Sequence, residues 1–195
     1  VQAILIKDHF SEKVDKVRLP VKEKGYFSFK VQPNMIIRFQ EGWSGFEDYL
    51  SAMKSKYRVR MRKALKRLKG IEKRELTNSE LQQQMPRIKD LFGQVIDKSD
   101  FTLLKCNLDY FVALQKAQPD KFKVIGFYKG EELLAFISYY MEGEVLLAGY
   151  TGFSAQHRDS HDLYLNILLS LVEQAFKHGA KSVIYGRTAM EIKSS

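Results

Sequence analysis

Three consecutive β-type segments in the second half of the chain constrain its fold more than any other feature. Aromatic and β-branched residues are frequent in Phe122–Tyr128, Leu133–Met141 and Glu144–Tyr150. The breaks between these segments are short and contain glycine, at Lys129-Gly130 and at Glu142-Gly143. Because such short connections join antiparallel neighbours, the sequence predicts a three-stranded antiparallel meander.

The hydrophobic period then changes from that of a strand to that of a helix. Asp162–His178 carries its apolar residues on one broad face, with Asp159 or Ser160 as N-cap and Gly179 at the C-terminal end. A final strand is expected at Ser182–Tyr185. A helix between two strands of one sheet makes a parallel, right-handed crossover. The expected fold class is therefore α/β (α+β), a mixed sheet flanked by helices.

The positive charge of the chain is concentrated in one segment. The formal net charge is +9 over 195 residues, yet residues 54–74 hold eleven basic residues and a single acid. The remaining 174 residues together carry a net charge of −1. Such a stripe is typical of proteins that bind nucleic acid, a phosphorylated cofactor or an anionic membrane. A solvated helix face is the alternative explanation, and charge alone favours neither.

The basic segment has the apolar periodicity of an amphipathic helix. Apolar residues recur at steps of three and four from Phe46 to Leu68, and basic residues follow one side. We expect one continuous helix with a capping box formed by Ser44 and Glu47, ending at Gly70.

Further elements are expected on either side of this helix. Thr77-Asn78-Ser79-Glu80 is another capping-box pattern and predicts a second helix, broken at Pro86, which would open a further helical piece. A short helix is expected from Asn107 to about Lys116. Residues 1–42 contain short β-like runs at Ala3–Ile6, Tyr26–Val31 and Met35–Phe39. We expect residues 1–42 to be the tail of a preceding N-terminal unit and residues 43–195 to form the main domain.

Two segments of the chain resemble a known protein family. Ser55-Lys56-Tyr57-Arg58, followed by Arg62-Lys63-Ala64, resembles the K-x-R…R-K-A helix of the FemAB-like branch of the GNAT acyltransferase superfamily. The segment Tyr185-Gly186-Arg187-Thr188-Ala189 is similar to the closing strand of that domain, and the meander ending in Gly149-Tyr150-Thr151-Gly152 fits the same order. The sequence is also similar to bacterial BioF2-like acetyltransferases, which carry an SKYR helix and a GRTA-x-EIKSS segment.

This resemblance covers about residues 43–195 and implies a GNAT-like domain that transfers an acyl or aminoacyl group to an amine. Further strands usually follow the one that ends near Tyr185, so the resemblance implies a truncated chain, incomplete at its C-terminus. It also implies that the open edge of Glu144–Tyr150 receives the acyl donor. The turn Phe153–Asp162 would then meet the donor's phosphates at a helix N-terminus.

Site residues follow from the same resemblance. It implies cofactor-binding roles for Gln156, Arg158 and Ser160, and substrate-binding roles for Lys56, Arg58, Arg62 and Arg187. Arg187 also suits a structural ion pair. Tyr150 and Tyr164 are the candidate general acids, and both also fit the alternative of core aromatics.

Two donors are compatible with this pattern, acyl-CoA and aminoacyl-tRNA. The turn reads Gln156-His157-Arg158-Asp159-Ser160-His161-Asp162, without the glycines with which acyl-CoA enzymes approach a pyrophosphate. Its two carboxylates repel a pyrophosphate. FemAB-like enzymes that use aminoacyl-tRNA also lack a strict glycine turn, and a basic helix suits them better.

Several site types are excluded or disfavoured. The single cysteine, Cys106, excludes a disulfide framework and a Cys-cluster zinc site, and we expect it to be a packing residue. His157 and His161 fit a surface pair better than metal ligands, so no metal is expected. No apolar run approaches the roughly 18–20 residues that span a bilayer. Residues 1–10 lack a signal-peptide pattern, and a cytoplasmic location is expected.

Two alternatives to catalysis remain open at this point. One is a nucleic-acid (RNA) binding module that acts through the basic helix of residues 54–74. The other is a GNAT-like scaffold that has lost catalysis.

Overall fold

A computed structural model describes residues 24–25, 27, 34–97 and 106–186 of the chain. The chain divides into two units, residues 1–33 and 34–195, and every described helix and strand belongs to the second unit. The expected strand at Ala3–Ile6 and nearly all of Tyr26–Val31 lie outside the described residues.

Six strands form one mixed sheet in the order β1-β6-β5-β4-β3-β2. They are β1 (Met35–Arg38), β2 (Glu72–Glu75), β3 (Phe122–Lys129), β4 (Glu132–Glu142), β5 (Val145–Phe153) and β6 (Ser182–Gly186). Antiparallel pairing of β3, β4 and β5 confirms the predicted meander. The parallel pairing of β6 with β5 confirms the predicted crossover, and with it the α/β fold class.

The two edge strands differ from what the sequence led us to expect. β1 pairs antiparallel with β6, so Met35–Arg38 is part of this sheet although we assigned it to the segment before the main domain. β2 was not predicted, because its sequence, EKRE, contains no apolar residue. It pairs antiparallel with β3 at the other edge of the sheet, where charged residues protect a strand against further pairing.

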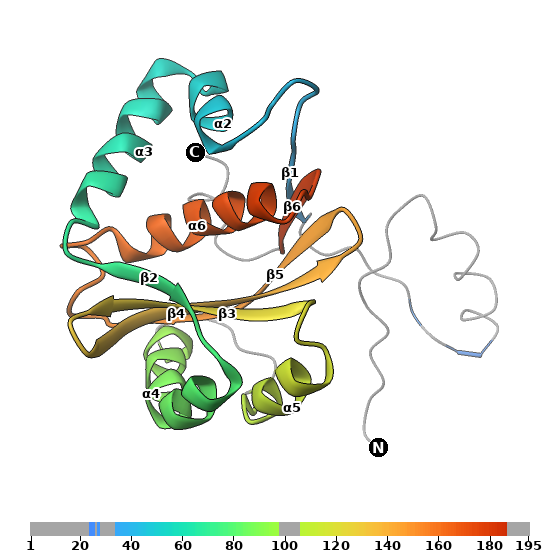
Figure 1. The fold of residues 1–195 in the computed structure, drawn as a ribbon, viewed down its shortest axis with the longest axis vertical. Coiled ribbons are helices and arrows are strands. Elements are labelled where there is room, and N and C mark those ends of the chain that lie inside the picture. The colour runs from blue at the N-terminus through green and yellow to red at the C-terminus, as the bar shows by residue number, and fades with distance from the viewer. Residues whose placement is uncertain (1–23, 26, 28–33, 98–105, 187–195) are drawn as a thin grey trace. The chain divides into compact units, whose positions relative to one another are not determined.

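Helices cover both faces of the sheet (Figure 1). On one face lies α6 (Leu163–Lys177), whose buried residues Ile167 and Leu171 pack with Phe127 and Leu146 of the strands. On the other face lie α4 (Asn78–Ile96) and α5 (Tyr110–Ala117). Their buried side chains, among them Leu81, Ile88 and Phe111, pack with Val124 and Phe136.

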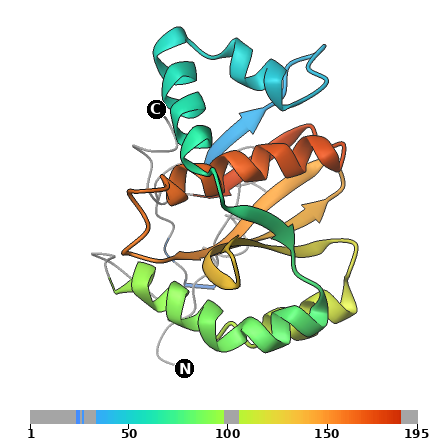
Figure 2. The same cartoon turned by 60° about the vertical axis from the view of Figure 1, so that its left-hand side comes forward.

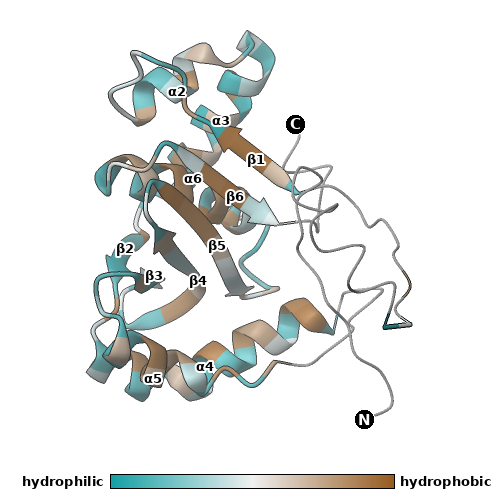
Figure 3. Ribbon diagram, turned by 90° about the vertical axis from the view of Figure 1, so that its right-hand side faces the viewer, coloured by the Kyte–Doolittle hydropathy of each residue, from teal (hydrophilic) through white to brown (hydrophobic). Residues whose placement is uncertain are grey.

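Two further helices pack on α6 rather than on the sheet. They are α2 (Phe46–Ala52) and α3 (Ser55–Arg67), which lie beyond α6 in Figure 2. A separate apolar cluster joins them to α6 and consists of Leu50, Met61, Ala64, Leu165 and Leu169. Coloured by hydropathy, β5 is a largely hydrophobic ribbon in the middle of the sheet, whereas α2 mixes hydrophilic and hydrophobic residues (Figure 3). The basic helix α3 therefore has one packed face and one outer face.

The single helix that we expected over residues 44–70 is two helices, so that prediction was wrong in detail. The chain is extended at Met53 and Lys54, where α2 ends and α3 begins. The guanidinium of Arg58 donates to the carbonyl of Ser51 at 2.9 Å and so satisfies the C-terminal end of α2. Both helices pack against α6, so the apolar stripe continues across the break and periodicity alone does not show it.

The helix caps confirm one prediction and correct two. Thr77 and Glu80 form the predicted capping box of α4, with the Thr77 N–H donating to the Glu80 carboxylate at 2.9 Å. At α2 the N-cap is Gly45, and Asp48 rather than Glu47 accepts the hydrogen bonds of the N-terminal amides. At α6 the N-cap is Asp162, with a left-handed φ of 45°, instead of Asp159 or Ser160.

Pro86 lies inside α4 without breaking it, contrary to our expectation. A proline in a helix leaves the carbonyl four residues earlier without its donor. Here Gln82 and Pro86 are both exposed, so water can take the place of the missing N–H. Gly70 and Gly179 both have positive φ angles just after their helices, as predicted.

Candidate functional site

A β-bulge interrupts the pairing of β4 with β5 in the middle of the sheet. Ile137 is paired with Thr151 and Tyr139 with Ala148, so Gly149 and Tyr150 together lie opposite Ser138. The side chain of Ser138 fills this irregularity. Its hydroxyl accepts a hydrogen bond from the Tyr150 N–H at 2.9 Å and donates one to the Tyr150 carbonyl at 3.1 Å. Ser138 is 1% exposed, so these bonds hold the bulge from within the sheet.

Glycine is required at position 149 by this close approach. A Cβ on Gly149 would lie 2.4 Å from the Ser138 hydroxyl oxygen and 2.9 Å from the Ser138 carbonyl oxygen. Glycine is also required at position 152, where the backbone of α4 is close. A Cβ added to Gly152 would lie 2.6 Å from backbone atoms of Leu91 and Phe92 in α4. An isolated glycine in a strand pattern is a signal for a bulge or a close approach, and Gly149 carried that signal in the sequence.

The bulge also changes the face on which Tyr150 lies. Leu146 and Ala148 belong to the apolar cluster on the α6 side, and regular alternation would place residue 150 there too. Tyr150 instead contacts aromatic rings on the α4/α5 side. Its ring centroid is 5.4 Å from that of Phe92, edge to face, and 6.4 Å from that of Phe111. The extra residue therefore directs Tyr150 to the opposite face.

Tyr150 has a partner that the sequence did not reveal, the single cysteine of the chain. A hydrogen bond with Cys106, together with partial burial, raises the pKa of the Tyr150 hydroxyl above its usual value. Tyr110 lies in the same electrostatic environment, and burial raises its pKa to about 12. Both tyrosines stay 40% exposed and remain protonated at neutral pH. Cys106 is therefore a neighbour of the candidate acid as well as a packing residue. It lies 44 residues before Tyr150 in the chain, and so this contact could not be predicted from the sequence.

Next to the bulge, β5 and β6 part from each other. Their parallel pairing runs from Val145 with Ser182 to Leu147 with Ile184, and in the described part of the chain it stops there. β6 goes on to Gly186 and is paired with β1 on its other side from Ser182 to Gly186. One edge of Ala148–Phe153 is therefore without a strand partner among the described residues. We call this segment the open β5 edge.

The other candidate acid, Tyr164, lies on the opposite side of β5. Its ring centroid is 5.8 Å from that of Phe153, and it packs against the apolar cluster on the α6 side. Burial raises the pKa of its hydroxyl. The structure therefore does not bring Tyr150 and Tyr164 together.

The turn between β5 and α6 is held by its own ion pairs. Arg158 forms two hydrogen bonds with the carboxylate of Asp159, at 2.7 and 3.2 Å. Ser160 donates to the carbonyl of His157 at 3.1 Å, and Gln156 is exposed. The three residues predicted to bind a phosphorylated donor thus share one turn, where Arg158 is already paired with an acid.

The C-terminal end of α3 is fixed to the same turn. Arg67 forms an ion pair with Asp162 at 2.8 Å, and His161 hydrogen-bonds to the Arg67 carbonyl at 2.9 Å. Asn166, which is 1% exposed, donates to the carbonyls of Ala64, His161 and Asp162. These contacts hold the basic helix beside the N-terminus of α6.

The basic residues predicted to bind substrate have different surroundings. Lys56 is exposed on α3, whereas Arg58 caps α2 and Arg62 forms an ion pair with Glu47 at 2.8 Å. Arg187 lies outside the described residues.

His157 and His161 stack with ring centroids 6.2 Å apart, and no cluster of potential metal ligands occurs among the described residues. In the part of the chain that the structure covers, no helix has the length and apolarity needed to cross a membrane.

Several solved structures share this arrangement of helices and strands. The crystal structure of FemX superposes with a TM-score of 0.64 at 14% sequence identity, over 91% of this chain and 61% of FemX. The C-terminal domain (DUF2156) of a putative lysylphosphatidylglycerol synthetase from Agrobacterium fabrum gives a TM-score of 0.56 at 15% identity, over 90% of this chain and 58% of that domain. A GCN5-related N-acetyltransferase from Kribbella flavida gives 0.50 at 11% identity, over 89% and 53%.

These likenesses concern the fold. By sequence, the chain matches no protein-family model and no curated protein. It spans about three fifths of the length of the first two structures, 61% and 58%. The bulged central strand, the parallel crossover and the likeness to FemX and to GNAT acetyltransferases together show that this chain has a GNAT/FemAB-like fold.

Proposed function

We propose that this chain is an N-acyltransferase that transfers an acyl or aminoacyl group to an amine. The observation that carries the proposal is the open β5 edge beside Tyr150, at the point where the bulge directs that tyrosine toward α4 and α5. An unpaired strand edge offers backbone N–H and C=O groups to an extended ligand, and here that ligand is the acyl donor. FemX and the GNAT acetyltransferase, which have the same fold, support this class of reaction.

Within that class we favour an aminoacyl ester such as aminoacyl-tRNA over acyl-CoA. The turn before α6 carries Asp159 and Asp162, which are already paired with Arg158 of the same turn and with Arg67 of α3. A pyrophosphate would compete with both carboxylates for the same arginines. Because aminoacyl-tRNA is a cytoplasmic donor, we propose a cytoplasmic location for the reaction.

Tyr150 has the properties of a general acid in such a transfer. The amine nitrogen attacks the carbonyl carbon of the donor, an N–C bond forms, and the bond from that carbon to the leaving oxygen breaks. The Tyr150 phenol gives its proton to the leaving oxygen, and the proton that the amine loses restores the phenol. Its raised pKa keeps the phenol protonated at neutral pH, as an acid requires. N–H groups of the open β5 edge would stabilise the developing oxyanion.

A transfer assay tests the proposal. The chain is incubated with charged tRNAs or acetyl-CoA and a panel of amines, and amide products are detected by mass spectrometry. Tyr150→Phe keeps the ring contacts with Phe92 and Phe111 and should lower the rate by about 10²–10⁴-fold. Tyr164→Phe is the matched control on the other face and should change the rate little. Absence of binding to both donors would leave the non-catalytic scaffold as the correct interpretation.

A second candidate function rests on the outer face of α3. Lys54, Lys56, Lys63, Lys66 and Lys69 are all exposed, and no ion pair among the described residues involves them. Such a face suits the phosphates of RNA. Arg58 and Arg62 are poor probes of it, because their replacement would loosen α2.

Neutral lysine variants test this second function. If the face contacts three phosphates of single-stranded RNA, Lys56→Gln, Lys63→Gln and Lys66→Gln together should reduce the slope of log affinity against log salt by about 2. The matched control replaces Lys116, Lys129 and Lys177, which are equally exposed on other elements. Equal slopes for both triple variants would reject RNA binding through α3.

A further inference from the structure

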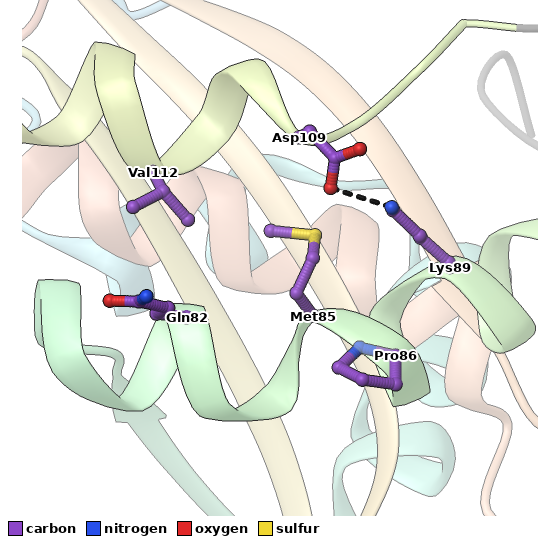
Figure 4. A pocket seen from close by; sticks show the side chains of 6 residues that line it. All are labelled: Gln82, Met85, Pro86, Lys89, Asp109 and Val112. Carbon is purple, nitrogen blue, oxygen red and sulfur yellow. Dashed lines mark ion pairs between the residues drawn. The ribbon is translucent and has the colours of Figure 1, made fainter.

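Two pockets lie between α4 and the start of α5, on the face of the sheet that carries Tyr150. The larger, of about 510 Å³, is lined by Gln82, Met85, Pro86, Lys89, Asp109 and Val112 (Figure 4). The smaller, of about 230 Å³, is bordered by Phe92, Ile96, Asp97, Cys106 and Leu108, and also by Lys89. Lys89 borders both, so the two pockets are neighbours, and we call them together the α4–α5 groove.

The smaller pocket leads to the proposed catalytic tyrosine. Phe92, in its wall, makes edge-to-face contact with the Tyr150 ring at 5.4 Å. Cys106, in the same wall, is near enough to the Tyr150 hydroxyl to raise its pKa. A ligand in this pocket is therefore separated from Tyr150 by the thickness of one side chain.

Apolar side chains make up most of the groove. Met85, Pro86 and Val112 line the larger pocket, and Phe92, Ile96 and Leu108 line the smaller one. The larger volume falls within the roughly 300–1,000 Å³ that is usual for small-molecule sites. The groove thus suits a ligand with an apolar body.

The charge in the groove favours a cation. Lys89 is neutralised by Asp109, with its Nζ 2.6 Å from the carboxylate, as Figure 4 shows. Asp97 is exposed at the end of α4 and has no ion-pair partner among the described residues. Among the described residues that line the smaller pocket, Asp97 is therefore the one carboxylate, and the one lysine, Lys89, is paired with Asp109.

We propose that the α4–α5 groove binds the acceptor of the transfer reaction, and that this acceptor is a primary amine carried on an apolar chain. This proposal rests on the proposed function, because it assigns the groove to the acceptor of that reaction. The amine binds as an ammonium ion beside Asp97 in the smaller pocket, and the apolar chain extends over Pro86 and Val112 in the larger one. The ammonium ion gives one proton to solvent, and the neutral amine then attacks the donor. The donor on the open β5 edge and the amine in the groove then approach Tyr150 from two sides.

The single cysteine provides a site-specific reporter of amine binding that needs no donor. Cys106 is the only cysteine of the chain, so its alkylation by iodoacetamide reports on the smaller pocket alone. We expect n-hexylamine to slow this alkylation at least fivefold in a saturable way, and n-hexanol to do so much less. Lengthening the amine from butyl to octyl should tighten binding by up to about fourfold per methylene.

Two variants distinguish a site that is specific for amines from a cavity that binds any apolar molecule. Asp97→Asn should weaken protection by hexylamine about tenfold, whereas Asp120→Asn, at an exposed turn away from the groove, should not. Equal protection by hexanol and hexylamine, or the absence of protection by either, would overturn the proposal.

Failure of the proposal differs from failure of the proposed function. If the chain acylates amines while hexylamine leaves Cys106 unprotected and Asp97→Asn leaves the KM for amine unchanged, the acceptor enters elsewhere and the groove proposal is wrong. Protection of Cys106 by amine without any transfer would instead refute the N-acyltransferase function and leave a binding site for amines.

Discussion

Replacement of Gly149 by alanine tests the structural basis of the site, because the bulge depends on the space at that position. The new Cβ would lie 2.4 Å from the Ser138 hydroxyl oxygen and 2.9 Å from the Ser138 carbonyl oxygen. The φ of Gly149 is not in the left-handed region, so steric overlap rather than backbone strain decides the outcome. Overpacking of this kind costs about 1–3 kcal/mol.

The two hydrogen bonds between Ser138 and Tyr150 would be disturbed as well. At about 1 kcal/mol each, their loss brings the expected destabilisation of Gly149→Ala to about 3–5 kcal/mol. Urea denaturation followed by circular dichroism measures this change in the free energy of unfolding. Gly93→Ala is the matched control, because nothing lies within 4 Å of its added Cβ, and it should be neutral or stabilising.

A double-mutant cycle identifies the atom responsible. Ser138→Ala alone should cost about 1–2 kcal/mol through the lost hydrogen bonds. If the hydroxyl of Ser138 is the obstacle, Gly149→Ala should cost at least about 1 kcal/mol less in the Ser138→Ala background than in the wild type. Strict additivity, or a Gly149→Ala variant as stable as the wild type, would refute this account of the bulge.

Three further perturbations have defined outcomes. Gly152→Ala should cost about 3 kcal/mol, since its Cβ would meet the α4 backbone at 2.6 Å, and a loss below about 1 kcal/mol in urea denaturation would contradict the close packing of β5 on α4. Asn166→Ala should cost about 2–3 kcal/mol because three carbonyls near the α6 N-terminus lose a buried donor, and a change below about 0.5 kcal/mol would show that these bonds are dispensable. Hydrogen bonds from Thr77, with that from Arg74, lower the pKa of Glu80. Its ionised form therefore adds stability at neutral pH that is lost as the pH falls through the carboxyl pKa, so the stability difference between wild type and Glu80→Gln should shrink from pH 6 to pH 3.

Local sequence signals predicted those elements whose partners are adjacent in the chain. The meander from Phe122 to Tyr150 follows from strand periodicity and glycine turns, and the capping box at Thr77 follows from spacing alone. The division of the basic helix at Met53 and Lys54 was missed because α2 and α3 share one packing surface on α6. β2 was missed because an edge strand at the surface needs no apolar residue.

The site depends on contacts between distant segments, and so less of it could be predicted. Tyr150 was identified from a resemblance, but its position on the α4/α5 face results from the bulge that Ser138 stabilises. Its contacts with Phe92 and Cys106 join segments far apart in the sequence. Conversely, Arg58 and Arg62 fit the sequence pattern of a substrate-binding helix, yet the structure shows each of them bonded to α2.

Backbone hydrogen exchange along β5 tests most directly whether a donor binds at the open edge. Amide exchange is measured on the chain alone, with acetyl-CoA, and with charged tRNA. We predict that one of these donors slows exchange in Ala148–Phe153, where β5 is paired with β4 but has no described partner on its β6 side beyond Leu147, and leaves exchange in β3 unchanged. Saturable donor binding without any protection of this segment would contradict the assignment of the open β5 edge as the donor site.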